Sequence, residues 1–172
     1  MNTQNDLSTK KHHNRNDLIG EHKWGDTGQV VLLILFLIIW ILDSFVFNYS
    51  TLLATYVPLY FRIPLGFLVL MYAWWFARSG LQIVFGEKRE KPEVIRKDVF
   101  SKVRHPIYLG SILLYLGMIL ITFSLISVAF WIFIILFYIW ISKYEEKILS
   151  EYFGKDYLDY KKEVPMLFPK LF

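Results

Sequence analysis

Cysteine is absent from all 172 residues of the chain. This absence excludes disulfides, thiolate metal ligands and thiol nucleophiles together. The chain also lacks an internal repeat. Its polar first 27 residues lack a short apolar core followed by a small-residue cleavage motif. We therefore expect the first apolar segment to be an anchor and not a signal peptide. His12 and His13 lie in this polar stretch, where a disordered basic tail is a simpler interpretation than a metal site.

Apolar residues, in contrast, make up 55% of the chain and aromatic residues 19%, which is typical of a membrane protein. Four apolar blocks are close to the length that a helix needs to cross about 30 Å of hydrocarbon at about 1.5 Å per residue. These blocks are residues 28–47, 57–77, 107–123 and 125–141, of which the second can extend to residue 85. Only Ser124 separates the last two, which predicts a tight helical hairpin. The sequence therefore predicts an all-α polytopic membrane protein with four transmembrane helices.

The basic residues predict the orientation, because Lys and Arg near span ends are retained on the cytoplasmic side. Arg62 is the one basic residue of 19 that lies on the opposite side of these four spans. We therefore expect an integral protein of the cell or inner membrane with both termini in the cytoplasm. The net charge of +4 then indicates no nucleic-acid partner, since this asymmetry and attraction to anionic lipid headgroups account for it.

The polar residues divide the chain into three parts. Residues 1–27 form a polar cytoplasmic tail, and residues 28–142 form the four-span membrane domain, which includes a cytoplasmic loop at 78–106. Residues 143–172 are expected to form cytoplasmic C-terminal helices. The first is an amphipathic helix that continues out of the fourth span, and the second is a short helix at 157–161. Gly154 is expected to interrupt the chain between them. The apolar residues that recur at helical spacing in the first helix are Tyr144, Ile148, Tyr152 and Phe153.

Two pairs of polar residues are expected to meet at the cytoplasmic interface. Arg104 is 20 residues before Ser124 and Glu145 is 21 after it, so an antiparallel hairpin places Arg104–His105 and Glu145–Glu146 at similar depth, within salt-bridge reach. Pro106 suits a first helical turn, where free N–H groups favour anions. Ordinary interfacial charges and aromatic anchors remain an alternative interpretation of the same residues.

Two further features have structural interpretations. Gly110 and Gly117 are expected to allow close helix packing within the membrane. Asp43 and Arg62, near the outer ends of the first two spans, are expected to form a structural pair, with a transport role as the alternative.

The last 80 or so residues resemble the isoprenylcysteine carboxyl methyltransferase and phospholipid methyltransferase group of integral membrane enzymes. The matching residues keep their order and spacing over some 70 positions on both sides of the apolar hairpin. They are Val99-Phe100, Arg104-His105-Pro106-Ile107-Tyr108-Leu109-Gly110, Glu145-Glu146, Leu149, Phe153-Gly154, Tyr157, Tyr160, Val164-Pro165 and Pro169.

This resemblance implies an S-adenosylmethionine-dependent methyltransferase that acts on a lipophilic acceptor, isoprenoid or phospholipid-like, which enters from the bilayer. Carried over by position, the residues implied to line the cofactor are Val94, Ile95, Phe100, Arg104, His105, Pro106, Ile107, Tyr108 and Glu145. Glu145 and Glu146 project about 100° apart on a helix, so they cannot face one site equally, and we assign Glu145 to the cofactor.

The chain departs from the family pattern at two positions. Asp98 stands where a glycine is common before the aromatic residue, which predicts an altered turn. Ile141 stands where prenylcysteine enzymes carry an arginine implicated in handling the substrate carboxylate. The acceptor and the catalytic base are therefore left open, with Glu146 and His105 as hypotheses for the base.

Other functions also fit a chain of this architecture. A membrane scaffold that has kept the fold without catalysis, a small transporter and haem binding through His105 are the alternatives. A transporter is expected to place an ionisable group in mid-membrane, which this sequence does not clearly do.

Overall fold

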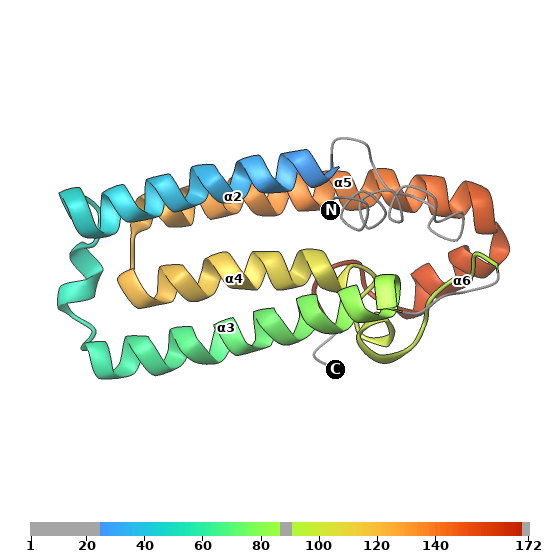
Figure 1. Ribbon diagram of the computed structural model, residues 1–172, viewed down its shortest axis with the longest axis horizontal. Coiled ribbons are helices and arrows are strands. Elements are labelled where there is room, and N and C mark those ends of the chain that lie inside the picture. Colours follow the sequence, from blue (N-terminus) through green and yellow to red (C-terminus); the bar gives the residue numbers. More distant parts are fainter. Residues whose placement is uncertain (1–24, 87–90, 170–172) are drawn as a thin grey trace, which may run out of the picture.

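The computed structural model describes residues 25–86 and 91–169 of the chain, and within these residues it contains helices and no strand. Five α-helices follow one another along the chain (Figure 1). They are α2 (Gly25–Ile41), α3 (Leu59–Leu81), α4 (Pro106–Thr122), α5 (Leu125–Phe153) and α6 (Lys155–Glu163). The all-α prediction is therefore confirmed. The predicted polar tail at residues 1–27 lies almost entirely outside the described residues.

Shorter helical turns join and extend these helices. The π-helical turns η1 (Leu42–Phe47) and η3 (Gln82–Gly86) continue α2 and α3, while the 3₁₀ turns η2 (Leu52–Thr55) and η4 (Asp98–Ser101) lie in the connections before α3 and α4. Helix α5 crosses residue 142 without a break, and Gly154, with φ of +56°, separates it from α6. That left-handed φ is one that glycine adopts without strain.

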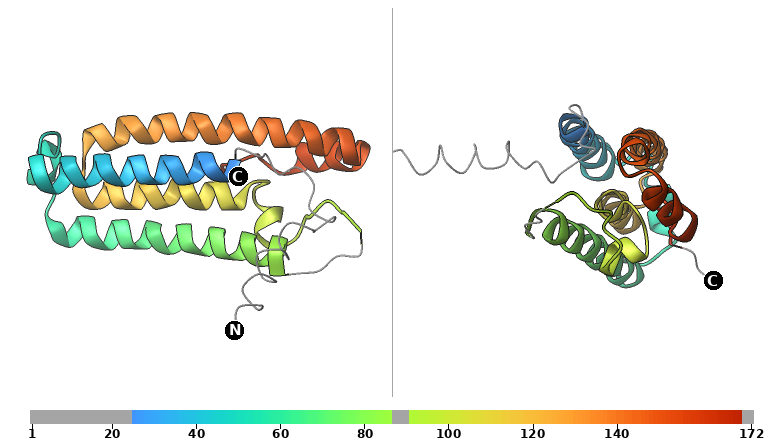
Figure 2. Two further views of the ribbon diagram at one scale, coloured as in Figure 1. Left: turned by 45° about the horizontal axis from the view of Figure 1, so that its top comes forward. Right: turned by 90° about the vertical axis from the view of Figure 1, so that its right-hand side faces the viewer.

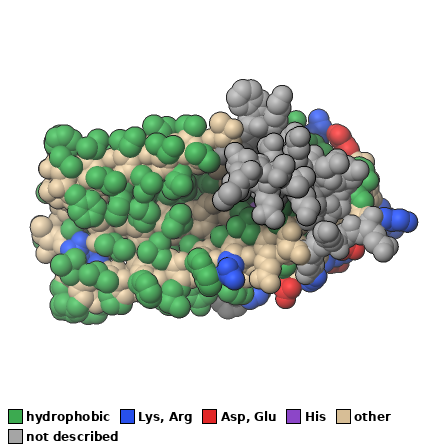
Figure 3. All heavy atoms as spheres, in the orientation of Figure 1, with side chains coloured by type: hydrophobic (Ala, Val, Ile, Leu, Met, Phe, Trp, Pro, Cys, Tyr) green, Lys and Arg blue, Asp and Glu red, His purple; other side chains and the backbone are tan. Residues whose placement is uncertain are grey.

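The helices run antiparallel, with α4 between α3 on one side and α2 with α5 on the other (Figures 1 and 2). Because the chain reverses at each connection, the start of α4 and the end of α3 lie at the same end of the bundle as the C-terminal half of α5 and α6. Hydrophobic side chains coat most of the length of the molecule in Figure 3, and charged side chains gather at this end. We call it the charged end, and the opposite end, which holds η1 and η2, the far end.

Three helices are long and apolar enough to cross a membrane, namely residues Thr27–Phe47, Leu59–Gly86 and Leu125–Phe153. They correspond to the first, second and fourth predicted spans, of which the second begins two residues later than predicted, at Leu59. The third predicted span corresponds to α4, an apolar helix that has 17 residues and is shorter than these three.

Helices α3 and α4 approach each other through glycine. A Cβ added at Gly110 would lie 2.9 Å from the backbone oxygen of Ala73 and 2.9 Å from the backbone nitrogen of Ala77. A Cβ at Gly66 would lie 2.8 Å from the Gly117 carbonyl oxygen, and one at Gly117 would lie 3.1 Å from the Gly66 carbonyl oxygen. The backbones therefore touch, which confirms the close packing predicted for Gly110 and Gly117.

Large side chains fill the space between α4 and the pair formed by α2 and α5. Tyr115 of α4, Tyr138 of α5 and Phe36 of α2 are fully buried together, and the Phe36 and Tyr115 ring centroids are 4.6 Å apart. Trp131 of α5 donates from Nε1 to the Ile112 carbonyl oxygen over 2.9 Å. This core contains Ile141 as well, so the position of the family arginine holds a buried apolar side chain.

A buried polar cluster fastens the far end. Asp43 accepts hydrogen bonds from the backbone N–H of Ser50 at 3.0 Å and from the hydroxyls of Ser50 and Ser124. Ser124 also begins α5, because its hydroxyl accepts from the Ser127 N–H over 3.1 Å. Phe123 takes a left-handed φ of +53° beside it, and these two residues make the tight hairpin that the sequence predicts.

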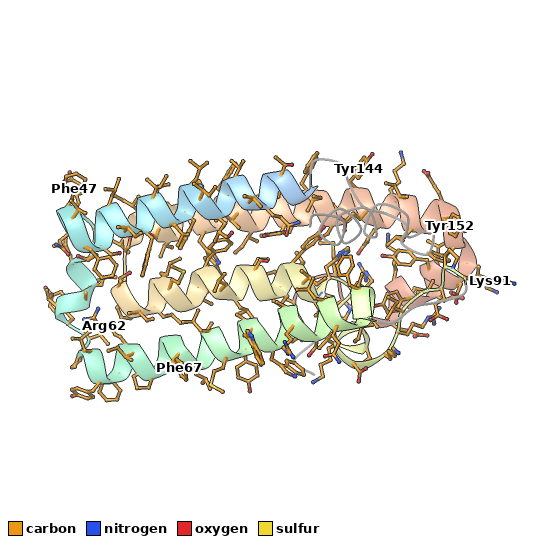
Figure 4. The ribbon with its side chains drawn as sticks, viewed as in Figure 1. Phe47, Arg62, Phe67, Lys91, Tyr144 and Tyr152 are labelled. Atoms are coloured by element: carbon orange, nitrogen blue, oxygen red, sulfur yellow. The ribbon has the colours of Figure 1, made fainter. Side chains whose placement is uncertain are left out.

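The predicted pairing of Asp43 with Arg62 is wrong. Arg62 of α3 donates instead to the Ile121 carbonyl oxygen over 2.8 Å, with its guanidinium 5.9 Å from the Phe123 ring centroid. Figure 4 labels Arg62 at the far end of the bundle. The physical reason is that the last turn of α4 leaves carbonyl groups without helical partners, and Arg62 supplies one of them with a donor.

Candidate functional site

The candidate site lies where the start of α4 meets the C-terminal part of α5 and the segment after α6. His105 is the N-cap residue of α4 and Pro106 its first residue, as the sequence predicts. The backbone N–H groups of Arg104 and His105 donate to the carbonyl oxygens of Pro165 and Met166, over 2.9 and 3.1 Å. The end of the described chain thus fixes the entrance to α4.

Arg104 and Glu146 form a buried ion pair at the centre of this region. Arg104 Nε donates to Glu146 Oε1 over 2.7 Å, and Nη2 lies 2.6 Å from the same oxygen. Lys161 of α6 places Nζ 3.1 Å from Glu146 Oε2. The Arg104 and Glu146 side chains are only 9% and 5% exposed, so water screens their attraction weakly.

Arg104 also binds the backbone at the end of α6. Its Nη1 donates to the Lys161 carbonyl oxygen over 3.0 Å and to the Val164 carbonyl oxygen. All three guanidinium nitrogens therefore have partners within the protein. The ion pair joins α4, α5 and α6 in one buried network, which we call the Arg104–Glu146 network.

Glu145 points to a different set of partners. Its Oε1 accepts a hydrogen bond from the Tyr108 hydroxyl, and its Oε2 lies 3.5 Å from His105 Nδ1. The His105 and Tyr108 rings are parallel, with centroids 5.5 Å apart. The prediction that Arg104–His105 and Glu145–Glu146 lie within salt-bridge reach is confirmed, and the structure pairs each glutamate with its own partner.

His105 stands between the two carboxylates. Its Nε2 lies 3.4 Å from Glu146 Oε1 without an aligned hydrogen bond, and this buried nitrogen has no hydrogen-bond partner among the described residues. Burial lowers the pKa of His105 below its usual value, although the neighbouring Glu146 acts in the opposite direction. The lowered pKa favours the neutral form of the imidazole.

The segment before α4 carries three of the predicted site residues, and the structure divides them between apolar clusters. Val94 packs against a cluster of α6 side chains that includes Tyr157 and Tyr160, whereas Ile95 and Phe100 pack against a cluster of α3, η4 and α4. The Tyr160 hydroxyl donates to the Phe100 carbonyl oxygen over 2.6 Å. The segment thus lies along α6 rather than away from the protein.

Arg96 gives the same segment a polar attachment to α6. Its Nη2 lies 2.5 Å from Asp156 Oδ1 and donates to the Asp156 carbonyl oxygen over 2.6 Å, and its guanidinium lies 5.6 Å from the Tyr160 ring centroid. Asp98 follows with φ of +51°, the left-handed conformation that glycine favours and aspartate tolerates. Asp98 therefore adopts the backbone conformation that a glycine would adopt here, whereas the sequence predicts an altered turn.

Pro106 and Ile107 lie on another side of α4. A Cβ added at Gly80 of α3 would lie 2.8 Å from Ile107 Cγ1 and 3.3 Å from Pro106 Cγ, so both side chains contact α3. Arg104, His105, Tyr108 and Glu145 are the predicted residues that the structure brings into one cluster. Sequence reasoning missed Lys161 in the network, because only the turn at Gly154 carries α6 back beneath α5.

One of three comparisons with known proteins found a match. The family model described as phospholipid methyltransferase matches residues 61–156, more than half of the chain, from the first turn of α3 to the start of α6. No curated protein and no solved structure matches the chain significantly. The matched region includes Arg104, His105, Tyr108 and both glutamates of the cluster. The chain belongs to the phospholipid methyltransferase family of membrane methyltransferases.

Proposed function

We propose that the protein is an S-adenosylmethionine-dependent methyltransferase that acts on a lipophilic acceptor, isoprenoid or phospholipid-like, drawn from the bilayer. The observation that carries this proposal is the position of Glu145, which lies beside His105 and Tyr108 at the junction of α4 and α5. This junction falls inside the region that matches the family model.

The residues of the junction suit the parts of the cofactor. Glu145 supplies an acceptor for amino or hydroxyl groups, and the first turn of α4 supplies backbone N–H donors for a carboxylate. The parallel rings of His105 and Tyr108 supply aromatic faces, which attract a sulfonium cation. Since the guanidinium nitrogens of Arg104 all have protein partners, we assign Arg104 to holding Glu146 and α6 in place.

Methyl transfer is an in-line displacement, and the bound cofactor supplies the activated methyl group. The chain then has to position the acceptor and exclude water. A carboxylate or thiolate acceptor needs no base, whereas an amine or phenol acceptor does. His105, whose lowered pKa favours the neutral imidazole and whose buried Nε2 has no hydrogen-bond partner among the described residues, suits this role better than Glu146, whose oxygens face Arg104 and Lys161.

We further propose that α4 is the fourth span and that the charged end faces the cytoplasm. Helix α4 is the most enclosed of the long helices, and its packing against α3 and α5 lets 17 residues cross where the neighbouring helices are longer. Basic residues are abundant at the charged end and Arg62 lies at the far end, which agrees with the positive-inside rule. Both termini then lie in the cytoplasm.

Binding of S-adenosylmethionine to the purified full-length protein tests the site. We expect Glu145→Gln to weaken binding at least about tenfold, since one charge-assisted hydrogen bond contributes about 1.5–3 kcal/mol. Glu151→Gln is the matched control, because Glu151 is an exposed residue of the same helix whose ion-pair partner among the described residues is Lys147, at 4.0 Å. Undiminished affinity in both Glu145→Gln and His105→Ala would contradict the assignment.

Transfer of a labelled methyl group into a membrane lipid extract then tests the reaction. Labelled product that partitions with lipid supports a lipophilic acceptor, and its sensitivity to base hydrolysis separates methyl esters from methylated amines. Binding of the cofactor without transfer to any lipid fraction would indicate a scaffold and would contradict the proposed reaction.

A further inference from the structure

Two tryptophans on the outer side of α3 each carry a cation at the charged end. The Arg78 guanidinium lies 5.3 Å from the Trp74 ring centroid, and Lys102 Nζ lies 4.8 Å from the Trp75 ring centroid. Trp74 is 64% exposed and Trp75 39%, so the rings are not part of the core. Arg78 comes from the last turn of α3, whereas Lys102 comes from the segment before α4. Two separate elements thus bring two positive charges to adjacent rings.

These cations differ from the others at the charged end in what balances them. Arg104 and Lys161 face Glu146, and Arg96 faces Asp156. Within residues 25–86 and 91–169, no carboxylate lies within ion-pair distance of Arg78 or Lys102. The rings hold both cations in place, and their charge is not neutralised by the described protein.

The surface that leads away from Arg78 is apolar. Phe67, Met71, Trp74 and Arg78 follow one another at spacings of four, three and four residues, so they share one face of α3. Phe67 and Met71 are exposed, and Figure 4 shows Phe67 on the outer side of α3. The eleven helical steps from Phe67 to Arg78 rise about 16 Å, close to half of the roughly 30 Å hydrocarbon thickness.

We propose that this face of α3, which we call the lipid face, binds an anionic phospholipid. Its phosphate lies between Arg78 and Lys102, and an acyl chain follows the apolar side chains of the face towards Phe67. The charge and the length both fit one lipid of a single leaflet. A soluble anion would contact the two cations and not the apolar part of this face, which continues into the hydrophobic surface seen in Figure 3. The lipid face lies on the α3 side of the bundle and contains none of the residues assigned to the cofactor, so the proposal does not depend on the proposed reaction.

Lys102 connects the bound lipid to the chain segment that leads into the candidate site. It lies two residues before Arg104, and the intervening Val103 is fully buried in the cluster with Phe76 of α3. A phosphate that holds Lys102 against Trp75 therefore also holds the segment that enters α4. We expect the bound lipid to stabilise the protein as well as to remain with it through purification.

Lipid retention by the full-length protein in detergent, measured by native mass spectrometry, tests the proposal. We expect the wild-type protein to retain phosphatidylglycerol over phosphatidylcholine of the same chain length. One basic residue near an anionic surface contributes roughly a fivefold preference, so R78Q/K102Q should lose about 30-fold in that preference. The control K143Q/K155Q removes the same charge from exposed lysines of α5 and α6 and should keep it.

A second pair of variants separates the rings from the charges. W74L/W75L keeps both cations and removes the rings that hold them, so a several-fold loss of preference is expected. Unchanged preference in R78Q/K102Q, or equal loss in K143Q/K155Q, would overturn the proposal. So would displacement of retained phosphatidylglycerol by millimolar inorganic phosphate, because that result indicates a site for free anions and not for a lipid.

Discussion

The Arg104–Glu146 network makes a quantitative prediction about stability. Replacement of Glu146 by glutamine removes the carboxylate that faces two Arg104 nitrogens and Lys161 Nζ, at 2.6 to 3.1 Å. Arg104 then remains charged and 9% exposed, with neutral carbonyl groups as its partners. Leaving one buried charge of a pair without its counter-ion costs about 3–5 kcal/mol, and we expect Glu146→Gln near the upper end of that range.

The three variants of the network should differ in a fixed order. Arg104→Gln leaves Glu146 with Lys161 at 3.1 Å, so its cost should be near the lower end, about 3 kcal/mol. Lys161 is about one-third exposed and can move into water, so Lys161→Gln should cost about 1 kcal/mol or less. The R104Q/E146Q double variant removes both buried charges and should cost about 2–3 kcal/mol less than the sum of the single variants.

Reversible unfolding in mixed micelles, followed by far-ultraviolet circular dichroism, measures these free energies. Lys147→Gln is the control, because Lys147 is exposed and pairs with Glu151 at 4.0 Å, and its cost should be below about 0.5 kcal/mol. Additive costs of Arg104→Gln and Glu146→Gln would refute the reasoning. So would a Lys161→Gln cost equal to that of Glu146→Gln, since the network would then not depend on burial.

Three other predictions concern single positions. Gly110→Ala should weaken the α3–α4 contact by about 1–3 kcal/mol, because its Cβ meets backbone atoms at 2.9 Å. Gly86→Ala should not, because its Cβ meets a Gln82 side-chain atom at 3.5 Å, an ordinary van der Waals distance. Equal melting temperatures of the two variants would contradict this. Asp98→Gly should leave thermal stability unchanged or raise it, since φ of +51° is strained for aspartate, and a marked fall would show that the Asp98 side chain is needed. The pKa of His105 is lowered in the folded protein, so the unfolded chain binds more protons than the folded protein between that lowered pKa and about 6.5. The free energy of unfolding should therefore fall as the pH falls through this range. His105→Gln should flatten this dependence of stability on pH, and an unchanged slope would count against the lowered pKa.

The helices themselves could be predicted from the sequence because membrane-spanning segments have a required length and composition. The predicted block at residues 125–141 begins at the correct residue, since Ser124 is both the end of an apolar run and a good N-cap. The sequence also predicts a helix that continues out of this block to an interruption at Gly154, and α5 extends twelve residues beyond residue 141, to Phe153. The contacts of Glu146 with Arg104 and Lys161 stabilise that extension.

The depth of the site could also be predicted, but not the pairing inside it. Counting from Ser124 places Arg104 and both glutamates at one level, and this holds in the structure. Which glutamate meets Arg104 depends on the rotation of α5 about its axis, which large side chains such as Tyr138 set in the core. The position of α6 beside α5 depends on the backbone dihedral angles of Gly154, and the neighbouring residues do not determine these angles.

The polar cluster around Asp43 has a mechanical consequence for the bundle. Asp43 joins the turn after α2 to Ser124 between α4 and α5, and Trp40 of α2 adds a hydrogen bond of 3.0 Å from Nε1 to Thr122 of α4. Because this cluster fastens one end, a displacement of α2 from α4 and α5 is smallest at the far end and largest at the charged end. Any sideways opening between these helices is therefore widest at the charged end, beside Glu145, and narrows towards the far end.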